Sequence, residues 1–347
     1  MTGRVFGRGA ALAAGLFSAV LCAAPASADS ADEFYKGRQV NFVVSTATGG
    51  GYDAYARLLA RHMGRYLAPD AKMVVQNMPG SGGIRAMMFL HAVAPKDGAT
   101  LGMVHSGVAL APALGIEEAK FDPLAVTWIG SVNKEGKVCI SMRDSPVKTF
   151  DDTFTHEYIV GGSGGGSQME TYPHAMAAMF GAKIRVISGY KSGTEVGLAM
   201  ERGEIMGRCG LSVTSIKATR PDWIDKKMIN FVVQTSLEAD PELPGVPMLT
   251  ELAKSDRDRT VLEVLFADQL MDRPVLAPPA VPKERAERLR AAFKQTLADK
   301  EFLADAAKQK LEIRYVSGDE VVALLKRVTT APPEVLKAAG AFLREQQ

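Results

Sequence analysis

Residues 41–67, NFVVSTATGGGYDAYARLLARHMGRYL, join an apolar strand to an amphipathic helix through a glycine-rich loop. Apolar side chains recur at helical spacing after Asp53, so we predict a strand followed by a helix. The loop has three consecutive glycines and no lysine. Glycine lets the backbone approach a ligand closely, and the free N–H groups of a helix start favour an anion. The stretch therefore predicts an α/β unit whose backbone amides bind a small anion.

The strand–loop–helix pattern continues beyond this stretch. Strands are predicted over residues 72–77 and 99–106 with a helix between them, and this βαβαβ order implies a parallel sheet. The pattern restarts over residues 156–236, where a second glycine loop, GGSGGGS at 161–167, lies between a strand and a helix. We therefore expect two α/β lobes with a ligand cleft between them, one lobe being inserted into the chain path of the other.

The lobe boundaries are expected where the pattern restarts and ends. We assign residues 29–135 together with 239–347 to the first lobe and residues 136–238 to the second. Helical spacing also predicts three helices near the C-terminus, over residues 283–298, 300–309 and 318–329.

Residues 1–28 have the features of a cleaved export signal. Arg4 and Arg8 precede an apolar run that is too short for a stable membrane anchor, and the small-x-small sequence ASA ends at Ala28. We expect a soluble, exported, periplasmic protein that begins near Asp29. The whole chain has 41 Lys and Arg against 39 Asp and Glu, and removing the signal leaves 39 of each. This neutral balance argues against a nucleic-acid partner and means that any anion site is local.

Two cysteines remain after cleavage, Cys139 and Cys209, both in segments with strand character. Since exported proteins fold under oxidising conditions, we favour a disulfide between them. In the chain-entropy model a loop of this size contributes about 4 kcal/mol to stability. The alternative is two separate buried thiols that act as small hydrophobic residues.

The candidate ligand site lies beyond the carboxyl ends of strands, where open α/β sheets bind ligands. Neither glycine loop has the Gly-Lys-Ser/Thr ending or the G-x-G-x-x-G spacing of nucleotide sites, so a carboxylate suits them better. Polar residues that follow other strands complete the set. The candidate ligand-binding residues are Thr46, Ala47, Thr48, Gly49, Gly50, Gly51, Tyr52, Asp53, His105, Ser106, Ser163, Gly164, Gly165, Ser167, Tyr190, Lys191 and Ser212.

Several of these residues also have structural interpretations. An ionised Asp53 would repel an anion, so over ligand contact we favour a structural role, in which it caps its own helix or lies in the first turn, where negative charge is favourable. Ser167 and Glu170 match a capping box, whereas Pro173 suggests that the regular helix starts near Tyr172, so Ser167 either caps or binds. A lone histidine such as His105 is more often structural than functional.

Catalytic and metal-binding patterns are weak in this sequence. The five histidines show no H-E-x-x-H or H-x-x-E-H spacing, and there is no G-x-S-x-G elbow. We therefore expect a binding protein with no catalytic residues, no metal ligands and no cofactor.

The ordered set of motifs resembles the substrate-binding proteins of tripartite tricarboxylate transporters, also called the Bug family. The motifs are the first glycine loop with Asp53 and RLLARHM, VVQNMPGSGGIRAM, APKDGATLGMV, GGSGGGSQ, GYKSG followed by AMERGEI, and VLAPPAVPKE. Each is weak alone, but together they cover nearly the whole mature chain in order.

The resemblance implies a bilobal fold of the periplasmic-binding-protein type, similar to type II. It also implies a monomer that closes on a small organic carboxylate and delivers it to a membrane permease. Carried over by residue, the facing loops are 46–53 and 163–167, with Tyr190 and Lys191 nearby. Family loops often carry prolines where this chain has Ala47 and Thr48, so the ligand or its water network is expected to differ.

Two other functions stay open at this point. An exported sensory module would present the ligand to a membrane receptor through the same closed form. An exported enzyme could use the same cleft, although the chain lacks a recognisable nucleophile and base. Which carboxylate binds is not readable from the sequence.

Overall fold

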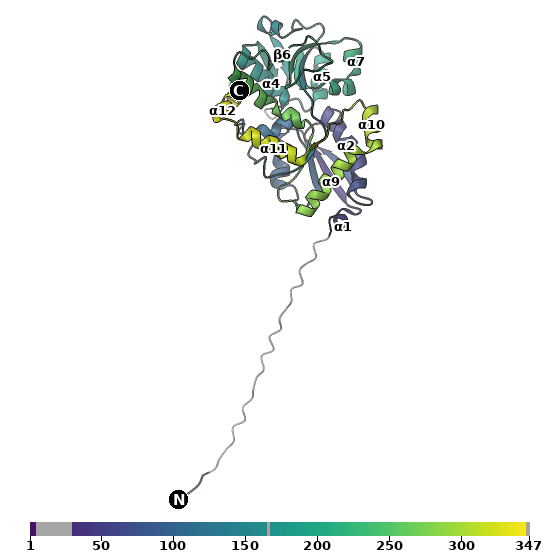
Figure 1. The fold of residues 1–347 in the computed structure, drawn as a ribbon, viewed down its shortest axis with the longest axis vertical. Coiled ribbons are helices and arrows are strands. Elements are labelled where there is room, and N and C mark those ends of the chain that lie inside the picture. The colour runs from purple at the N-terminus through teal and green to yellow at the C-terminus, as the bar shows by residue number, and fades with distance from the viewer. Residues whose placement is uncertain (5–29, 165–166, 345–347) are drawn as a thin grey trace.

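Two separate β-sheets organise the chain (Figure 1). The computed structural model describes residues 1–4, 30–164 and 167–344. Helices flank each sheet, which confirms the expected fold of two α/β lobes. The export signal expected at residues 1–28 lies almost entirely outside the described residues. Among the described helices, none combines the length and the apolar character that a membrane crossing requires.

The first sheet is made of β1 (Gln39–Val44), β2 (Lys72–Asn77), β3 (Thr100–Met103), β4 (Thr127–Ser131), β10 (Pro274–Ala277) and β11 (Val316–Ser317). Their order across the sheet is β11-β4-β10-β3-β1-β2. β1 pairs in parallel with both β2 and β3, which confirms the predicted βαβαβ unit. β10 comes from much later in the chain and lies antiparallel between β3 and β4.

The second sheet is made of β5 (Lys137–Met142), β6 (Tyr158–Gly161), β7 (Ile184–Ile187), β8 (Gly207–Leu211) and β9 (Ile229–Thr235). Their order is β7-β6-β8-β5-β9. β6 is parallel to β7 and β8, whereas β5 is antiparallel to β8 and β9. All five strands come from one continuous stretch of chain, which supports the proposed insertion of one lobe into the other.

Helices connect and cover these sheets. The α-helices before the second lobe are α1 (Ala31–Tyr35), α2 (Gly51–Leu67) and α3 (Ile84–Met88). The second lobe contains α4 (Gln168–Phe180), α5 (Gly193–Glu201), α6 (Val213–Thr219) and α7 (Pro221–Asp225). The C-terminal part contains α8 (Asp256–Phe266), α9 (Lys283–Ala298), α10 (Lys300–Lys308), α11 (Gly318–Thr329) and α12 (Pro333–Arg344). Short helical turns are η1 (Ser81–Gly83), η2 (Phe89–Val93), η3 (Ser106–Leu110), η4 (Asp151–Phe154) and η5 (Ala267–Met271).

Side chains of β1 alternate between two hydrophobic cores. Phe42 and Val44 belong to the core formed with α2 and α9, whereas Val43 belongs to the core on the opposite face. This alternation is the two-residue period of a strand that is covered on both faces. Packing on both faces fixes the end of β1 relative to both layers of helices. The glycine loop that follows β1 is therefore fixed as well.

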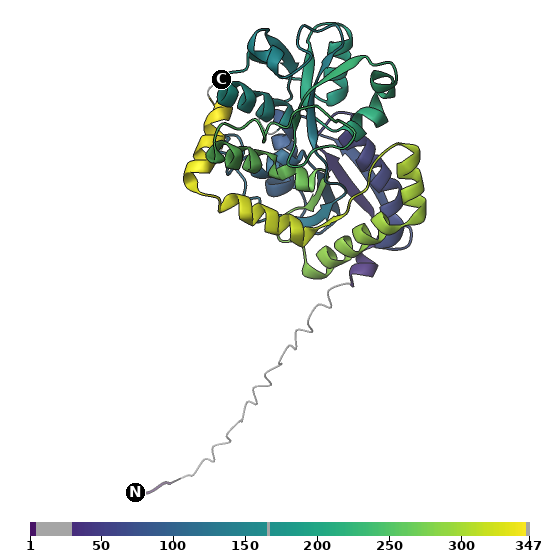
Figure 2. The same cartoon turned by 45° about the horizontal axis from the view of Figure 1, so that its top comes forward.

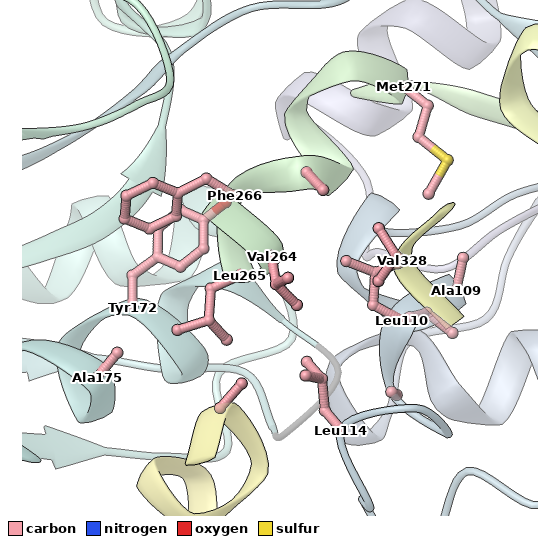
Figure 3. Packing of buried hydrophobic residues seen from close by; sticks show 14 of the residues in the cluster. Ala109, Leu110, Leu114, Tyr172, Ala175, Val264, Leu265, Phe266, Met271 and Val328 are labelled. Carbon is pink, nitrogen blue, oxygen red and sulfur yellow. The ribbon is translucent and has the colours of Figure 1, made fainter. Parts of the chain in front are cut away.

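One hydrophobic core continues from the first lobe into the second. Tyr172 of α4 packs edge-on against Phe266 of α8, with ring centroids 4.8 Å apart (Figure 3). Leu110 of the first lobe and Leu265 of α8 belong to the same buried cluster. α12 packs against both α8 and α4, so it lies against a helix of the second lobe (Figure 2). The lobes are therefore connected by packed helices as well as by the segments of chain that run between them.

The predicted disulfide is confirmed. Cys139 of β5 and Cys209 of β8 form a bridge that spans 70 residues of sequence. The alternative of two separate thiols is therefore wrong. The bridge connects neighbouring antiparallel strands in the middle of the second sheet.

One expectation about helices is wrong, and one helix was not predicted. α4 begins at Gln168 rather than near Tyr172, because Ser167 caps it by accepting a hydrogen bond from the Met169 N–H at 3.1 Å. Pro173 lies inside the helix, where its missing N–H removes one backbone hydrogen bond, and the burial of most of the surrounding helix compensates. The C-terminal α12 is not among the three predicted helices, although those three are present as α9, α10 and α11.

Asp268 of η5 lies buried at the junction between the lobes. Its Oδ2 accepts hydrogen bonds from Gln168 Nε2 at 2.7 Å and Ser106 Oγ at 3.0 Å, and its Oδ1 accepts one from the Tyr172 hydroxyl at 3.0 Å. Ser106 is in the first lobe, whereas Gln168 and Tyr172 are in α4. Burial raises the pKa of Asp268 to about 6, although the three hydrogen bonds oppose this shift.

Stability is expected to depend on pH through Asp268. Burial raises the pKa of Asp268 from 3.8 to about 6, so the folded state favours the protonated carboxyl. The stability that the protonated carboxyl contributes is fully present below pH 3.8 and is lost as the pH rises through about 6. Relative to an Asp268→Asn variant, the wild-type protein should therefore be more stable at about pH 4 than at about pH 7. Thermal melts of both proteins measure this difference, and a difference that is equal at the two pH values would contradict the assignment.

Candidate functional site

A cavity of about 70 Å³ lies between the two lobes. Its walls include the starts of α2, α4 and α5 and the end of β8. The first lobe contributes Thr46, Gly50 and Gly51, and the second contributes Gly193 and Arg208. Each lobe therefore supplies backbone and side-chain groups to one shared volume.

The first glycine loop is held in shape by Asp53. Its Oδ2 accepts hydrogen bonds from the Gly49 N–H and from Arg57 Nε, both at 2.9 Å. Asn77 donates to Asp53 Oδ1 at 2.9 Å and to the Thr46 carbonyl at 2.8 Å. Burial acts to raise the pKa of Asp53, but these hydrogen bonds outweigh it and lower the pKa. Asp53 lies in the first turn of α2, buried behind the loop and outside the cavity lining, and it does not cap the helix, because the N-cap residue is Gly50.

The start of α2 lies at the cavity, where Gly50, Gly51 and Tyr52 belong to the lining. Its N-cap residue is Gly50, so no side chain caps the first turn. A Cβ at Gly51 would lie 3.1 Å from Ser215 Oγ and 3.5 Å from Arg273 Nη2. Any larger residue at this position would crowd the Ser215 hydroxyl. Because the first N–H groups of a helix lack partners within it, this wall favours an anion.

Arg208 brings a positive charge to the opposite wall. It lies in β8, and its Nη1 donates to the Gly193 carbonyl at 2.9 Å. Within the described residues, its hydrogen bonds and ion pairs include no aspartate or glutamate. Burial lowers the pKa of Arg208 to about 10, and the neighbouring Arg220 charge adds to this effect. The side chain therefore stays protonated at neutral pH without an acidic partner.

The charge of Arg273 is compensated within the protein, in contrast to that of Arg208. Arg273 pairs with Asp272 and lies 3.6 Å from Glu135, and Lys137 lies 2.6 Å from Asp272. Burial acts to lower the pKa of Arg273, but the neighbouring groups, with the Asp272 carboxylate first among them, together raise it above its usual value. Its guanidinium also lies over the ring of Tyr52, 4.4 Å from the centroid. These two cations and two anions form a buried, neutral group beneath the cavity.

Three polar atoms around the cavity are buried without a hydrogen-bond partner. They are Thr46 Oγ1, Arg208 Nε and Arg273 Nε. Buried polar groups in folded proteins are nearly always hydrogen-bonded, so unpartnered groups at a cavity mark places where a ligand or water binds. Two of the three can only donate, which matches the open N–H groups at the start of α2.

Another wall of the cavity is apolar. Met169, Leu211, Ile216 and Trp223 contribute to it. Arg220 lies beside Trp223 but is paired with Glu201 at 3.1 Å. A ligand with a negatively charged end and a carbon skeleton therefore matches this combination of walls.

His105 is a neutral structural residue at the cavity edge. Its Nδ1 lies 2.9 Å from the Gly82 carbonyl, which can only accept, so Nδ1 carries the proton. Burial lowers the pKa of His105 to about 4, although the hydrogen bond to Gly82 opposes this shift. The ring packs edge-on against Tyr52 with centroids 4.6 Å apart, and the Tyr52 hydroxyl donates to the Asp272 carbonyl at 2.9 Å.

The lobes are in direct contact around the cavity. Thr194 Oγ1 donates to the Gly49 carbonyl at 2.8 Å, and the Ala47 N–H donates to the Lys191 carbonyl at 3.1 Å. A third link joins Arg273 Nη2 to Ser215 Oγ at 3.0 Å. The structure is therefore a closed form of the two-lobed fold.

The structure divides the sequence-predicted site residues into two groups. Those that line the cavity are Thr46, Gly50, Gly51, Tyr52, His105 and Ser167. Those that lie in the surrounding loops, outside the lining, are Ala47, Thr48, Gly49, Asp53, Ser106, Ser163, Gly164, Tyr190, Lys191 and Ser212. Gly165 lies outside the described residues.

Several of the surrounding residues have defined structural contacts. Ser212 caps α6 by accepting from the Ser215 N–H at 3.1 Å. The Ser163 carbonyl accepts from the Gly82 N–H at 2.6 Å. Glu170 accepts from the Gly164 N–H at 2.8 Å and does not complete the predicted capping box with Ser167. These contacts shape the two loops around the cavity.

Sequence reasoning missed the arginines of the cavity wall, among them Arg208 and Arg273. Arg208 stands between Gly207 and Cys209 within a strand, and Arg273 directly precedes the buried β10. A charged residue inside an otherwise buried strand was the available signal. Because such a residue is costly without a partner, it deserves a functional explanation.

One group of side chains outside the cavity has metal-ligand chemistry. His62, Asp299 and Glu301 bring ligand atoms within 4.8 Å of one another. Arg65 lies 2.7 Å from Asp299 and 2.6 Å from Glu301, so both carboxylates already pair with a cation. This group supports an ion-pair network between α2 and α10 rather than a metal site.

Comparison with known families gives one match over most of the chain. A family model described as the tripartite tricarboxylate transporter family receptor matches residues 55–339. A curated relative, the UPF0065 protein in the TAR-I ttuE-ttuC' intergenic region of Agrobacterium vitis, is 27% identical over 279 residues. That alignment covers 78% of this chain and 76% of the relative.

Solved structures with the same fold include several binding proteins. The periplasmic binding protein BugD has a TM-score of 0.69 at 22% identity, covering 88% of this chain and 99% of its own. MatC from Rhodopseudomonas palustris with bound malate has a TM-score of 0.67 at 19% identity, covering 86% and 99%. A second R. palustris protein, with adipate, has a TM-score of 0.67 at 19% identity, covering 87% and 97%.

Asp53→Ala should destabilise the protein. The change leaves the Gly49 N–H and the Asn77 amide without their acceptor, and each such loss costs about 1–3 kcal/mol. Urea unfolding should therefore show a free energy of unfolding lower by about 2–4 kcal/mol. Asp222→Ala is the matched control, because Asp222 also pairs with a cation four residues later but is exposed. Equal effects of the two substitutions would contradict the role assigned to Asp53.

Proposed function

The chain belongs to the tripartite tricarboxylate transporter receptor family, and we propose that it captures a small organic carboxylate between its two lobes. In this proposal the protein works outside the cytoplasm as a monomeric solute-binding protein, and its closed form delivers the acid to a membrane permease of the tripartite type. The family and the fold are those of binding proteins. We assign no catalytic residue, metal or cofactor.

Arg208 is the observation that carries this proposal. Arg208 is half-buried, and its Nε is fully buried. A guanidinium removed from water to this extent is costly unless a negative charge accompanies it. The fully buried cations at the cavity floor, Arg273 and Lys137, are paired with Asp272 and Glu135. Arg208 has no such partner within the described residues, and its Nε is free. A ligand carboxylate supplies the missing charge.

The remaining contacts follow from the same geometry. One carboxylate can accept hydrogen bonds from the α2 amides at Gly51 and Tyr52, from the Thr46 hydroxyl and from an arginine Nε. The carbon skeleton of the acid then packs against the apolar wall that contains Ile216 and Trp223. The small volume favours a short acid over a bulky one. The malate and adipate held by two proteins of this fold support a carboxylate as the class of ligand.

Ligand binding would favour the closed form of the protein. The α2 amides come from the first lobe and Arg208 from the second, so the ligand gains its full set of contacts only when the cleft is shut. Micromolar affinity corresponds to about −8 kcal/mol, which a few charge-assisted hydrogen bonds and partial apolar burial can supply. The closed form would then be the one that the permease recognises.

Arg208→Gln should weaken binding by about 10- to 100-fold, because a hydrogen bond to a charged group contributes about 1.5–3 kcal/mol. A thermal-shift screen of short organic acids first identifies a binder, since a ligand of the folded state raises the melting temperature. Calorimetry with that acid then gives the affinity of each variant. Arg185→Gln is the control, because Arg185 is an exposed arginine of β7 in the same sheet and is paired with Glu157. Unchanged affinity in Arg208→Gln would refute the role of this residue, and a screen without a binder would refute the proposed function.

Gly50→Val should abolish binding while the fold survives. A Cβ at Gly50 would lie 3.9 Å from Ser192 Cβ and from Thr194 Oγ1, so the branched side chain would obstruct closure. The backbone angles of Gly50, φ −92° and ψ 174°, suit any residue. Gly50→Ala is the control, because a single methyl group fits at that distance. Calorimetry should show no binding for valine and retained binding for alanine, and retained binding for valine would remove this loop from the site.

A further inference from the structure

The strand that carries Arg208 has a bulge at the disulfide. In the antiparallel pair β5–β8, Ile140 is opposite Arg208, but Val138 is opposite Leu211. Cys139 therefore faces both Cys209 and Gly210, so β8 has one extra residue at this point. Gly210 has a φ of +71°, and a Cβ there would lie 2.8 Å from the Gln168 backbone. A bulge of this kind bends its strand and redirects the neighbouring side chains.

The bulge separates two residues of the cavity wall. Arg208 and Gly210 both line the cavity, whereas Cys209 between them is buried in the hydrophobic core. On the core side, Cys139 contacts Met176 of α4, with Sγ and Sδ 3.6 Å apart. The same short segment therefore places a charge on one face and a sulfur on the other.

A bulge weakens the register of the strand that contains it. Side chains alternate faces with a period of two, so moving the extra residue by one position would turn Arg208 from the cavity face to the core face. β5 also has a shifted register against β9, between Cys139 and Ile140. Hydrogen bonding is therefore irregular on both sides of Cys139, and strand pairing alone holds this register weakly.

We propose that the Cys139–Cys209 disulfide fixes the register of β8 against β5 and thereby keeps Arg208 on the cavity face. The bond joins the bulge residue of β8 to the one residue of β5 that faces it, so β8 cannot slide at this position without breaking a covalent bond. In this role the two cysteines position Arg208, the positive charge that faces the ligand, in addition to stabilising the fold. The inference rests on the proposed function for its consequence in binding, but its structural part does not need a ligand.

The close contact between Arg208 and Gly193 fits this assignment. Arg208 makes its hydrogen bond to the Gly193 carbonyl at 2.9 Å, and a Cβ at Gly193 would lie 2.4 Å from Arg208 Nη1. The guanidinium therefore fits against a bare backbone, and a small displacement of β8 would lose this contact. A bridge elsewhere in the sheet would stabilise the lobe without controlling that fit.

The first test is a crystal structure of the full mature chain with Cys139→Ala and Cys209→Ala, without ligand. We expect Arg208 to lose its hydrogen bond to Gly193, and amide hydrogen exchange to become faster over residues 207–211. Cys139→Val with Cys209→Ala restores buried volume and serves as the second variant if the first does not fold. Val232→Ala in β9 is the control, because it removes buried volume on the far side of β5 from β8. Arg208 that keeps its place in both disulfide-free variants would overturn the proposal.

The second test is a double-mutant cycle for binding of malate, measured by calorimetry well below the melting temperatures. Removing the disulfide should weaken binding about tenfold or more in the wild-type background and have little effect in the Arg208→Gln background, because the two changes act through one group. Equal losses in both backgrounds would mean that the bridge does not act through Arg208, which overturns the proposal. If the wild-type protein binds no malate, the position of Arg208 in the disulfide-free crystal structures decides the proposal, and the proposed function is judged by the acid screen.

Discussion

A guanidinium that is taken out of water needs a negative charge beside it, and the protein supplies none to Arg208 within its described residues. The neighbouring cations differ in this respect. Arg273 and Lys137 share the carboxylates of Asp272 and Glu135, so the floor of the cavity is neutral. The wall that contains Arg208 is left with a positive charge, and the cavity can hold a carboxylate that balances it.

The opposite wall of the cavity is formed by the first glycine loop and the start of α2. The Asp53 carboxylate accepts hydrogen bonds from Gly49, Arg57 and Asn77, so it shapes the glycine loop without facing the cavity. Gly50 leaves the first turn of α2 without a side-chain cap. Asp268 connects Ser106 in the first lobe to Gln168 in the second, next to the cavity. The two lobes therefore place the first turn of α2 and Arg208 on the same cavity.

Much of this architecture could be predicted because its signals are local in the sequence. The apolar run before the first glycine loop and the helical spacing after it predict β1 and α2, and two cysteines in an exported chain predict the disulfide. The arginines could not be placed in the same way. Arg208 reaches the cavity because of how β8 pairs with β5, and Arg273 because β10 inserts between β3 and β4. Strand pairing over long sequence distances is not visible in a local pattern. The sequence therefore predicted that the start of α2 lies at the cavity, but it did not predict Arg208 or Arg273 there.

A crystal structure of the protein with a short organic acid that raises its melting temperature tests this account most directly. We predict that a carboxylate group lies between the first turn of α2 and the guanidinium of Arg208, within hydrogen-bonding distance of both. An acid bound elsewhere, or bound in the cavity with its carboxylate turned away from Arg208, would contradict the account.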